Sequence, residues 1–212
     1  MASDFHTHNT KSRYRALVSS PVPIAGHLTS FEFHPWNLPM EFIPELIQTG
    51  SCLSGFTAIG EIGLDKLHLP DMTIQLQYLE KLCELSIELH KPVVIHCVKA
   101  FDELFAVLKR FPVKAMFHGF RSSPEMLDEL WKRKITVSFH PQMVNNPALM
   151  HKLSNAKGGF GFESDDIKDI DLEFLLDTAE LNSKVAGLEK ITDQNFFITK
   201  FFSFFIQKQT RA

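Results

Sequence analysis

Residues 92–118 read PVVIHCVKAFDELFAVLKRFPVKAMFH, and this stretch indicates the fold class. Two short apolar runs, Pro92–Cys97 and Val113–His118, flank the segment Phe101–Arg110, in which apolar residues recur with the period of a helix. A strand, a helix and a second strand in this order are typical of a βαβ unit, in which the two strands run parallel. Each apolar run has a histidine at or next to its carboxyl end. The stretch therefore predicts a parallel sheet with polar side chains along one edge.

The same alternation covers most of the chain. Further apolar runs typical of strands are Ala2–His8, Arg15–Ser19, Leu28–His34, Gly55–Ile62, Lys134–Phe139 and Gly158–Glu163. Further segments of helical period are Met40–Thr49, Pro70–Leu89, Pro124–Arg133, Pro147–Ser154, Asp171–Thr178 and Thr192–Lys208. Eight strands that alternate with helices predict an α/β fold, a TIM-type βα barrel.

The length of the chain indicates that some helices of this barrel are absent. The 212 residues are fewer than the roughly 250 that are typical of the fold. Asn9–Tyr14 and Ser20–His27 are too short for ordinary crossover helices. We therefore expect a compact barrel with one or two early crossover helices missing, formed by residues 1–212 as a single domain.

Composition narrows the functional classes. The net charge of −3 provides no basic field for non-specific binding of nucleic acid. The three cysteines have no paired spacing, which argues against a disulfide framework or a cysteine zinc site and fits a reducing compartment. We find no apolar leader and no run near the roughly 20 apolar residues of a membrane span. The expected location is therefore cytoplasmic, without membrane contact.

Metal-ligating side chains recur at the ends of the predicted strands. His6 and His8 are two residues apart in a strand, so they point to the same side, and Asp4 could orient one ring. In a parallel barrel the carboxyl ends of all strands open on one face, where active sites are found. Nitrogen and carboxylate donors without thiolates suit zinc, manganese or magnesium, and six are enough for two ions that share a carboxylate. The six candidates are His6, His8, Glu61, His96, His118 and Asp165.

Each candidate also has an ordinary interpretation. A single histidine after an apolar run is more often a hydrogen-bonded core residue than a metal ligand. Glu61 could be a solvated residue at a strand-end turn, and Asp165 could cap a helix. The joint pattern, with polar residues at matching strand ends, favours the metal site.

The same residues carry a resemblance to a known family. The chain resembles the TatD family of metal-dependent deoxyribonucleases, within the amidohydrolase-like barrels. The matching segments, in the order of the family, are DFHTH (4–8), FHPW (33–36), GEIGLD (60–65), VIH (94–96), MFH (116–118) and FESD (162–165). The resemblance implies that His6 and His8 bind one metal ion. It also implies that His96 and His118 bind a second, with Glu61 as a bridging ligand.

The resemblance further implies a reaction and a substrate class. Asp165 would ligate metal and act as general base on the attacking water, with Glu61 as its catalytic partner. Two divalent ions, zinc, magnesium or manganese, would serve the hydrolysis of DNA or another phosphoester. Members of the family usually carry an arginine soon after the fifth-strand histidine, where this chain has Cys97-Val98-Lys99. The predicted substrate contacts are Lys99, Arg121 and His34; a solvated loop role for Arg121 and a structural role for His34 are the alternatives.

Two other functions remain open at this stage. One is a metal-dependent hydrolase of an amide, a lactone or another small ester, because related barrels use the same ligands for those bonds. The other is a catalytically lapsed relative that still binds metal. In addition, a phenylalanine-rich helix in Thr192–Lys208 could pack on the barrel or support weak self-association.

Overall fold

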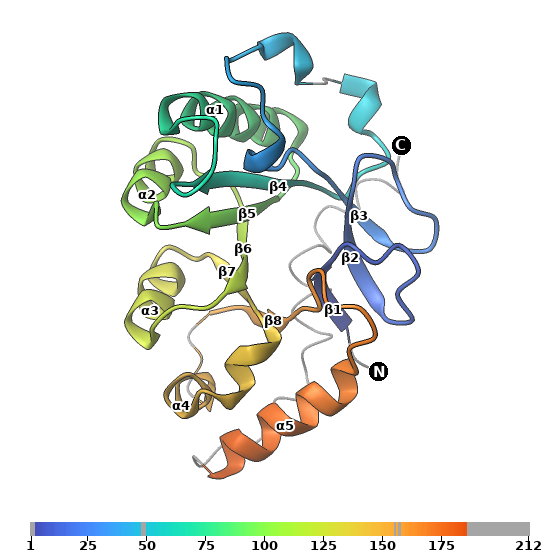
Figure 1. Ribbon diagram of the computed structural model, residues 1–212, viewed down its shortest axis with the longest axis vertical. Helices are drawn as coiled ribbons and strands as arrows, with labels where there is room; N and C mark the ends of the chain where they lie inside the picture. The colour runs from blue at the N-terminus through green and yellow to red at the C-terminus, as the bar shows by residue number, and fades with distance from the viewer. Residues whose placement is uncertain (1–2, 48–49, 155, 157, 186–212) are drawn as a thin grey trace. The chain divides into compact units, whose positions relative to one another are not determined.

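The computed structural model of the chain describes residues 3–47, 50–154, 156 and 158–185 (Figure 1). Its eight strands follow one another in chain order within one sheet. The strands are β1 (Ser3–Thr7), β2 (Arg15–Ser20), β3 (Leu28–Phe31), β4 (Ala58–Asp65), β5 (Val93–Val98), β6 (Ala115–Phe120), β7 (Thr136–Phe139) and β8 (Phe160–Phe162). The α-helices are α1 (Met72–Leu89), α2 (Phe101–Arg110), α3 (Pro124–Lys132), α4 (Pro147–Ser154) and α5 (Leu172–Val185). All eight predicted strands are confirmed.

The chain forms two compact units, which we describe one at a time. The first unit contains residues 1–18 and 117–212, and the second contains residues 19–116. The assignment of the whole chain to a single domain stays a prediction. The predicted helix Thr192–Lys208 lies outside the described residues. Within the described part, we find no helix with both the length and the apolar character that crossing a membrane requires.

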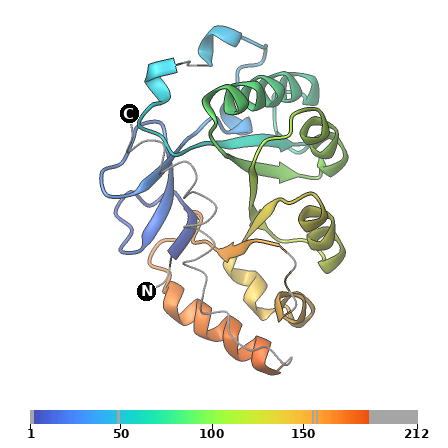
Figure 2. The same cartoon turned by 180° about the vertical axis from the view of Figure 1, so that it is seen from behind.

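In the second unit, close strand pairing depends on a glycine. Strand β4 pairs in parallel with β3 and with β5, and Gly63 lies opposite His96. A Cβ atom at Gly63 would lie 1.8 Å from the carbonyl oxygen of His96, and the φ angle of Gly63 is +151°. Only glycine tolerates both conditions. Helices α1 and α2 lie side by side in this unit (Figures 1 and 2).

In the first unit, the first and last strands meet. Strands β7 and β8 pair in parallel, and Thr7 forms a parallel bridge with Asp165, three residues beyond the end of β8. The buried ring of Phe139 contacts those of Phe160 and Phe162, with centroids 6.2 and 5.7 Å apart. Helices α4 and α5 pack against each other (Figure 2). The end of β1 is therefore joined to residues that are far away in the sequence.

The predicted helix Met40–Thr49 is wrong. The structure has two short 3-10 helices, η2 (Pro44–Leu46) and η3 (Gly50–Leu53), and residues 48–49 are not described. Pro44 lies in the middle of the predicted helix, where its ring and its missing N–H disrupt α-helical bonding. Among the described residues, the connections after β1, β2 and β3 all lack an α-helix. Three early crossover helices are thus missing, rather than one or two.

Several predicted strand ends also move, by one to three residues, and the move at the fourth strand changes the place of a candidate ligand. The fourth strand was expected to end at Ile62, which would put Glu61 at its end. Strand β4 continues to Asp65, so Glu61 lies within the strand and Asp65 ends it. The sequence pattern placed the strand end too early because the polar residues Glu61 and Asp65 interrupt the apolar run. The backbone nevertheless pairs with β5 as far as Asp65.

Candidate metal centre

In the first unit, His6, His118 and Asp165 come together from β1, β6 and the segment after β8. One possible ligand atom of each side chain lies within 4.8 Å of those of the other two. His6 and His118 are buried, and their ring centroids lie 4.5 Å apart. Two imidazoles and a carboxylate at this spacing are donors that a divalent metal ion could bind. The sequence predicted all three residues as ligands.

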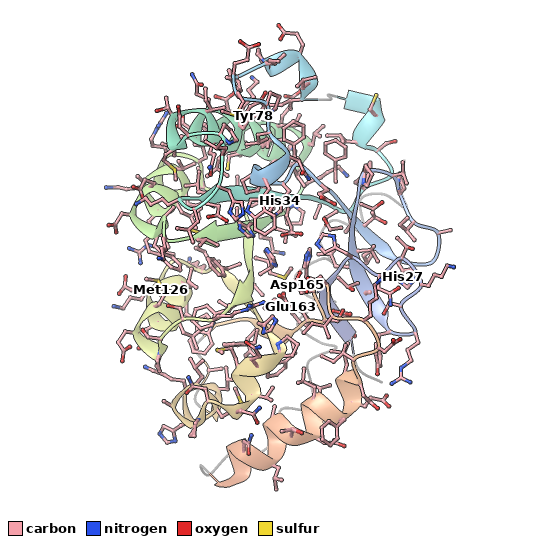
Figure 3. The ribbon with its side chains drawn as sticks, in the orientation of Figure 1. His27, His34, Tyr78, Met126, Glu163 and Asp165 are labelled. Carbon is pink, nitrogen blue, oxygen red and sulfur yellow. The ribbon has the colours of Figure 1, made fainter. Side chains whose placement is uncertain are left out.

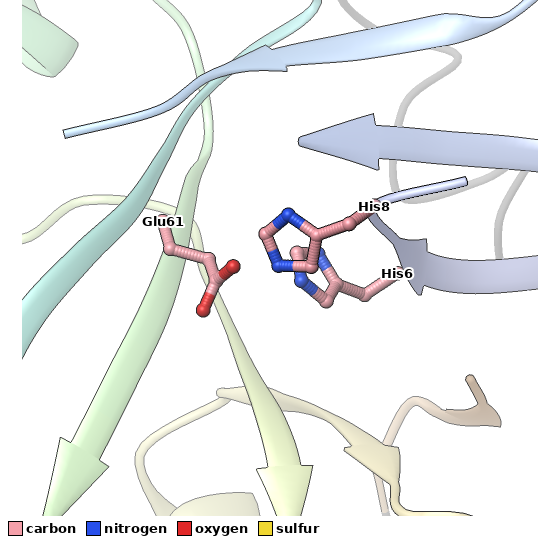
Figure 4. Close-up of side chains that lie close together, drawn as sticks. All are labelled: His6, His8 and Glu61. Carbon is pink, nitrogen blue, oxygen red and sulfur yellow. The ribbon is translucent and has the colours of Figure 1, made fainter. Parts of the chain in front are cut away.

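Backbone pairing holds Asp165 beside the end of β1. The N–H of Asp165 donates to the carbonyl of His6 (3.0 Å), and the N–H of His8 donates to the carbonyl of Asp165 (3.1 Å). Asp165 has a φ angle of +55°, in the left-handed region that aspartate adopts more readily than most residues. His6 and His8 extend to the same side from the end of β1 (Figure 4). The His8 side chain is 38% exposed, with its Nε2 4.0 Å from Oδ1 of Asp165.

Asp4 fixes the position of the residue that precedes Asp165. The N–H and the hydroxyl of Ser164 donate to the two carboxylate oxygens of Asp4 at 3.0 and 2.7 Å. Burial outweighs these hydrogen bonds and raises the pKa of Asp4 to about 6. The sequence suggested Asp4 as a partner for an imidazole; the structure shows that it holds the residue before Asp165.

Glu163 is a site residue that the sequence analysis missed. It is fully buried, and its Oε1 accepts a hydrogen bond from the N–H of Gly119 (2.7 Å) and lies 3.6 Å from Nδ1 of His118. Its Oε2 is buried without a hydrogen-bond partner among the described residues. Figure 3 shows Glu163 next to Asp165. The argument applied to Glu61, a carboxylate after an apolar run, would have found it.

The second unit contains its own set of donors, His34, Glu61 and His96. Their ligand atoms also lie within 4.8 Å of one another. Oε2 of Glu61 lies 3.5 Å from Nε2 of His34 and 3.8 Å from Nδ1 of His96. Glu61 is 2% exposed and His34 is 8% exposed. Figure 4 shows the Glu61 carboxylate extending from β4. That this set and the set in the first unit share one centre stays a prediction.

Asp65 orders the side chains beside His96. Its Oδ2 accepts a hydrogen bond from the indole N–H of Trp36 (2.7 Å) and lies 3.4 Å from Nε2 of His96. Its Oδ1 accepts from the N–H of Leu67 (2.8 Å). Burial raises the pKa of Asp65, but these hydrogen bonds outweigh it and hold the pKa below its ordinary value. Asp65 is therefore an ionised group that positions neighbouring rings.

The predicted substrate contacts have different surroundings. Arg121 is half exposed, and its Nη2 lies 4.0 Å from Oδ2 of Asp165, at the open side of the first donor set. Lys99 is exposed and directly follows β5. His34 is nearly buried against Glu61 and accepts a hydrogen bond from the N–H of Trp36 (3.2 Å). His34 thus resembles the candidate ligands around it more than an exposed substrate contact.

The shortened loop after β1 lines a cleft in the first unit. The cleft has a volume of about 370 Å³, and its walls include Lys11, Arg13 and Tyr14 from this loop. Asp4 and Ser164 also line it. Arg13 is held by the hydroxyl of Tyr14 (2.6 Å), which fixes the position of one basic group beside the cleft. The loop therefore still shapes a polar opening although it lacks a helix.

Both donor sets fit divalent metal ions. They contain only imidazole and carboxylate groups, which zinc and manganese accept and of which magnesium accepts the carboxylates. In the first unit, the buried Oε2 of Glu163 would be costly without a nearby positive charge or water. Nitrogen ligands that contact a second carboxylate, as His118 contacts Glu163, are usual around bound metal ions.

A sheet of eight strands in chain order defines a class of protein, the TIM-type βα barrel, and the imidazole and carboxylate donors near its strands give it candidate metal sites. Within this class, the family profile described as TatD related DNase matches residues 24–156. The chain belongs to this family. The matched segment includes Glu61, His96 and His118, while His6, His8 and Asp165 lie outside it.

Individual relatives agree with this assignment. The chain is 29% identical over 91 residues to a protein of Schizosaccharomyces pombe named deoxyribonuclease Tat-D, a match that covers 40% of this chain and 28% of that protein. A TatD family hydrolase from Entamoeba histolytica has a similar structure, with a TM-score of 0.65, 15% identity and 95% of each chain covered. The YjjV homologue of TatD from Escherichia coli gives a TM-score of 0.58 at 15% identity, covering 87% of this chain and 94% of that one. These solved structures share the barrel fold.

Proposed function

We propose that this protein is a metal-dependent hydrolase that cleaves phosphodiester bonds in DNA. The observation that carries the proposal is the set formed by His6, His118 and Asp165, whose ligand atoms lie within 4.8 Å of one another. Membership of the TatD related DNase family supports the substrate class. The name of the yeast relative points to the same chemistry.

The proposed ligands are the six residues predicted from the sequence, and two divalent ions are proposed. His6, His8, His118 and Asp165 lie in the first unit, and Glu61 and His96 lie in the second. We add His34 as a further candidate, because its Nε2 lies 3.5 Å from the Glu61 carboxylate. When bound, divalent ions lower the pKa of a coordinated water and neutralise charge on a phosphate.

The candidate site of the first unit has a buried side and a solvent-exposed side, and we propose a different function for each. His6, His118 and Glu163 are buried, so they hold the site in one geometry. Asp165 is 18% exposed at its side chain, and it can accept the proton of an attacking water at Oδ1 or Oδ2.

Arg121 and His8 form the open side. Both contact Asp165 at 4.0 Å and are more exposed than it is. A phosphate that approaches Asp165 therefore passes a guanidinium group, which can form two parallel hydrogen bonds to phosphate oxygens. This arrangement supports Arg121 as a replacement for the arginine that the family usually carries after the fifth-strand histidine. Lys99 is proposed as a second, weaker phosphate contact.

The decisive experiment compares the cleavage of single-stranded DNA by the wild type and by Asp165→Asn, with added magnesium, manganese or zinc. We expect metal-dependent cleavage that falls at least a hundredfold in Asp165→Asn, because general-base catalysis contributes about 10²–10⁴-fold. Asp177→Asn, an exposed carboxylate on α5, is the matched control and should cleave like the wild type. Equal slow rates for all three proteins would refute the proposal.

Two further measurements separate the alternatives. Mass spectrometry of the metal content should find two divalent ions per chain, with fewer in Asp165→Asn. Activity on lactones or amides without activity on DNA would point to the small-ester hydrolase. Bound metal without any turnover would point to a lapsed enzyme. The cytoplasmic location and the weak self-association stay predictions.

A further inference from the structure

Two aromatic rings stack on each other beside His96 in the second unit. The rings of Trp36, in η1 (Pro35–Asn37), and His68, after β4, have centroids 4.2 Å apart and planes inclined by 23°. Trp36 is 51% exposed and the His68 side chain is 47% exposed. A tryptophan is usually buried to a large extent, so this pair keeps a large aromatic surface open to solvent.

A single carboxylate oxygen holds both rings in place. Oδ2 of Asp65 accepts a hydrogen bond from the indole N–H of Trp36 at 2.7 Å and lies 3.0 Å from Nδ1 of His68. Asp65 is itself 1% exposed and fixed at the end of β4. The exposed stack is therefore pre-organised, so ordering it on binding costs little.

The stack lies directly against the candidate metal ligands. The Trp36 ring contacts the rings of His34 and His96, with centroid distances of 4.8 and 5.7 Å. The oxygen that holds the stack is also 3.4 Å from Nε2 of His96. A planar ligand on this stack would therefore lie next to His34 and His96, the candidate metal ligands of the second unit.

We propose that Trp36 and His68 form a stacking platform for a nucleobase of a single-stranded DNA substrate, adjacent to the candidate metal ligands His34 and His96. This inference rests on the proposed function and adds the part of the substrate that the second unit recognises. Base stacking on aromatic side chains tolerates any base, because every base has a π face. It also suits a chain with a net charge of −3, since stacking requires no surrounding basic field.

The test is a binding measurement that does not depend on turnover. Fluorescence anisotropy is recorded for the Asp165→Asn chain, which should not cleave, with labelled oligothymidylates in the presence of manganese. A series of oligonucleotides carries one abasic site at successive positions, which removes a base and leaves the phosphates. At one position, we expect the loss of the base to weaken binding about tenfold, equal to about 1.4 kcal/mol. This lies within the range for bases stacked on aromatic side chains.

The decisive comparison combines the abasic site with a change in the platform. Trp36→Leu should weaken binding of the intact oligonucleotide about tenfold and should have almost no further effect on the abasic one. Trp36→Phe, which keeps an aromatic face, should restore most of the affinity. His68→Ala tests the second ring and should show the same dependence on the base. Phe174→Leu removes an exposed aromatic ring from α5 and should change nothing.

A second signal comes from the tryptophan itself. The chain has two tryptophans, and Trp131 is buried with its N–H donating to the carbonyl of Gly159 (3.2 Å). In a Trp131→Phe background, the intact oligonucleotide should quench the fluorescence of Trp36, and the oligonucleotide abasic at the decisive position should not. Equal quenching by both would overturn the platform.

The two proposals fail in different ways. If the wild type cleaves DNA but Trp36→Leu loses the same factor on intact and abasic oligonucleotides, the platform is refuted and the proposed function stands. If the wild type neither binds nor cleaves single-stranded DNA with any of the metals, both are refuted. The metal content of Trp36→Leu shows whether its loss of affinity comes from disturbed metal ligands. If it does, the results for Trp36→Phe and His68→Ala decide whether the two rings bind a base.

Discussion

The close approach of β5 to Gly63 leads to a sharp prediction about stability. In Gly63→Ala, the new Cβ would lie 1.8 Å from the carbonyl oxygen of His96, about 1.6 Å short of an ordinary 3.4 Å contact. The opposing atom is backbone, so it cannot rotate away as a side chain could. Strand β5 would have to move, and the parallel pairing of Gly63 with His96 would be lost.

The magnitude follows from two separate effects. A positive φ angle costs an alanine about 1–2 kcal/mol. Overpacking against a fixed neighbour costs about 1–3 kcal/mol. Together they predict that Gly63→Ala lowers the free energy of unfolding by about 2–5 kcal/mol. For a chain of this length each kcal/mol lowers the melting temperature by about 2–4 °C, which gives a decrease of about 4–20 °C.

Gly26→Ala is the matched control. Gly26 also has a positive φ angle, +83°, but a Cβ atom there would meet nothing within 4 Å. It should therefore lose only the backbone contribution of about 1–2 kcal/mol, with a decrease in melting temperature of about 2–8 °C. Thermal unfolding followed by circular dichroism in EDTA separates folding from metal binding. Equal decreases for the two variants would refute the argument from close approach.

Three further predictions concern the metal centre and the thiols. Glu163→Gln should weaken metal binding about 10–100-fold, because Glu163 supports His118. The affinity is measured by competition with a chromophoric chelator, and an unchanged affinity would contradict this function of Glu163. The metal-free variant should keep the melting temperature of the metal-free wild type. Removal of metal by EDTA should lower the melting temperature, since a ligand at 100 times its Kd stabilises by about 2.7 kcal/mol; a melting temperature independent of added metal would argue against a bound ion. At pH 8 a thiol reagent should label Cys52, which is exposed, and should leave Cys83, which is buried and whose thiol pKa is raised by burial to about 12. Equally rapid labelling of both in the folded protein would be inconsistent with this burial.

The strands and the helices of the later part of the chain could be predicted from the sequence. Their apolar runs are short and clearly separated, as in Val93–Val98 and Phe101–Arg110, so periodicity identifies them. The helix expected over Met40–Thr49 failed because the apolar period ignored Pro44, which cannot continue an α-helix.

The sequence indicated candidate ligands that the structure brings close together, but it did not indicate the residues that support them. His6, His118 and Asp165 could be found because chemistry-bearing residues stand out at the ends of apolar runs. Asp65 and Trp36 are joined by a hydrogen bond across 29 positions, between a short 3-10 helix and a strand end, and no local sequence pattern predicts such a contact. Glu163 was not predicted, because Asp165, two residues later, already supplied a carboxylate ligand at this strand end.

The backbone bonds between Asp165 and the end of β1 have a consequence for how the protein is made. His6 emerges from the ribosome early, but the first donor set is complete only after residue 165 has been synthesised and has joined β1. A nascent chain would therefore hold metal weakly until its eighth strand is in place. Capture of the ion would then mark the moment at which this part of the molecule has finished folding.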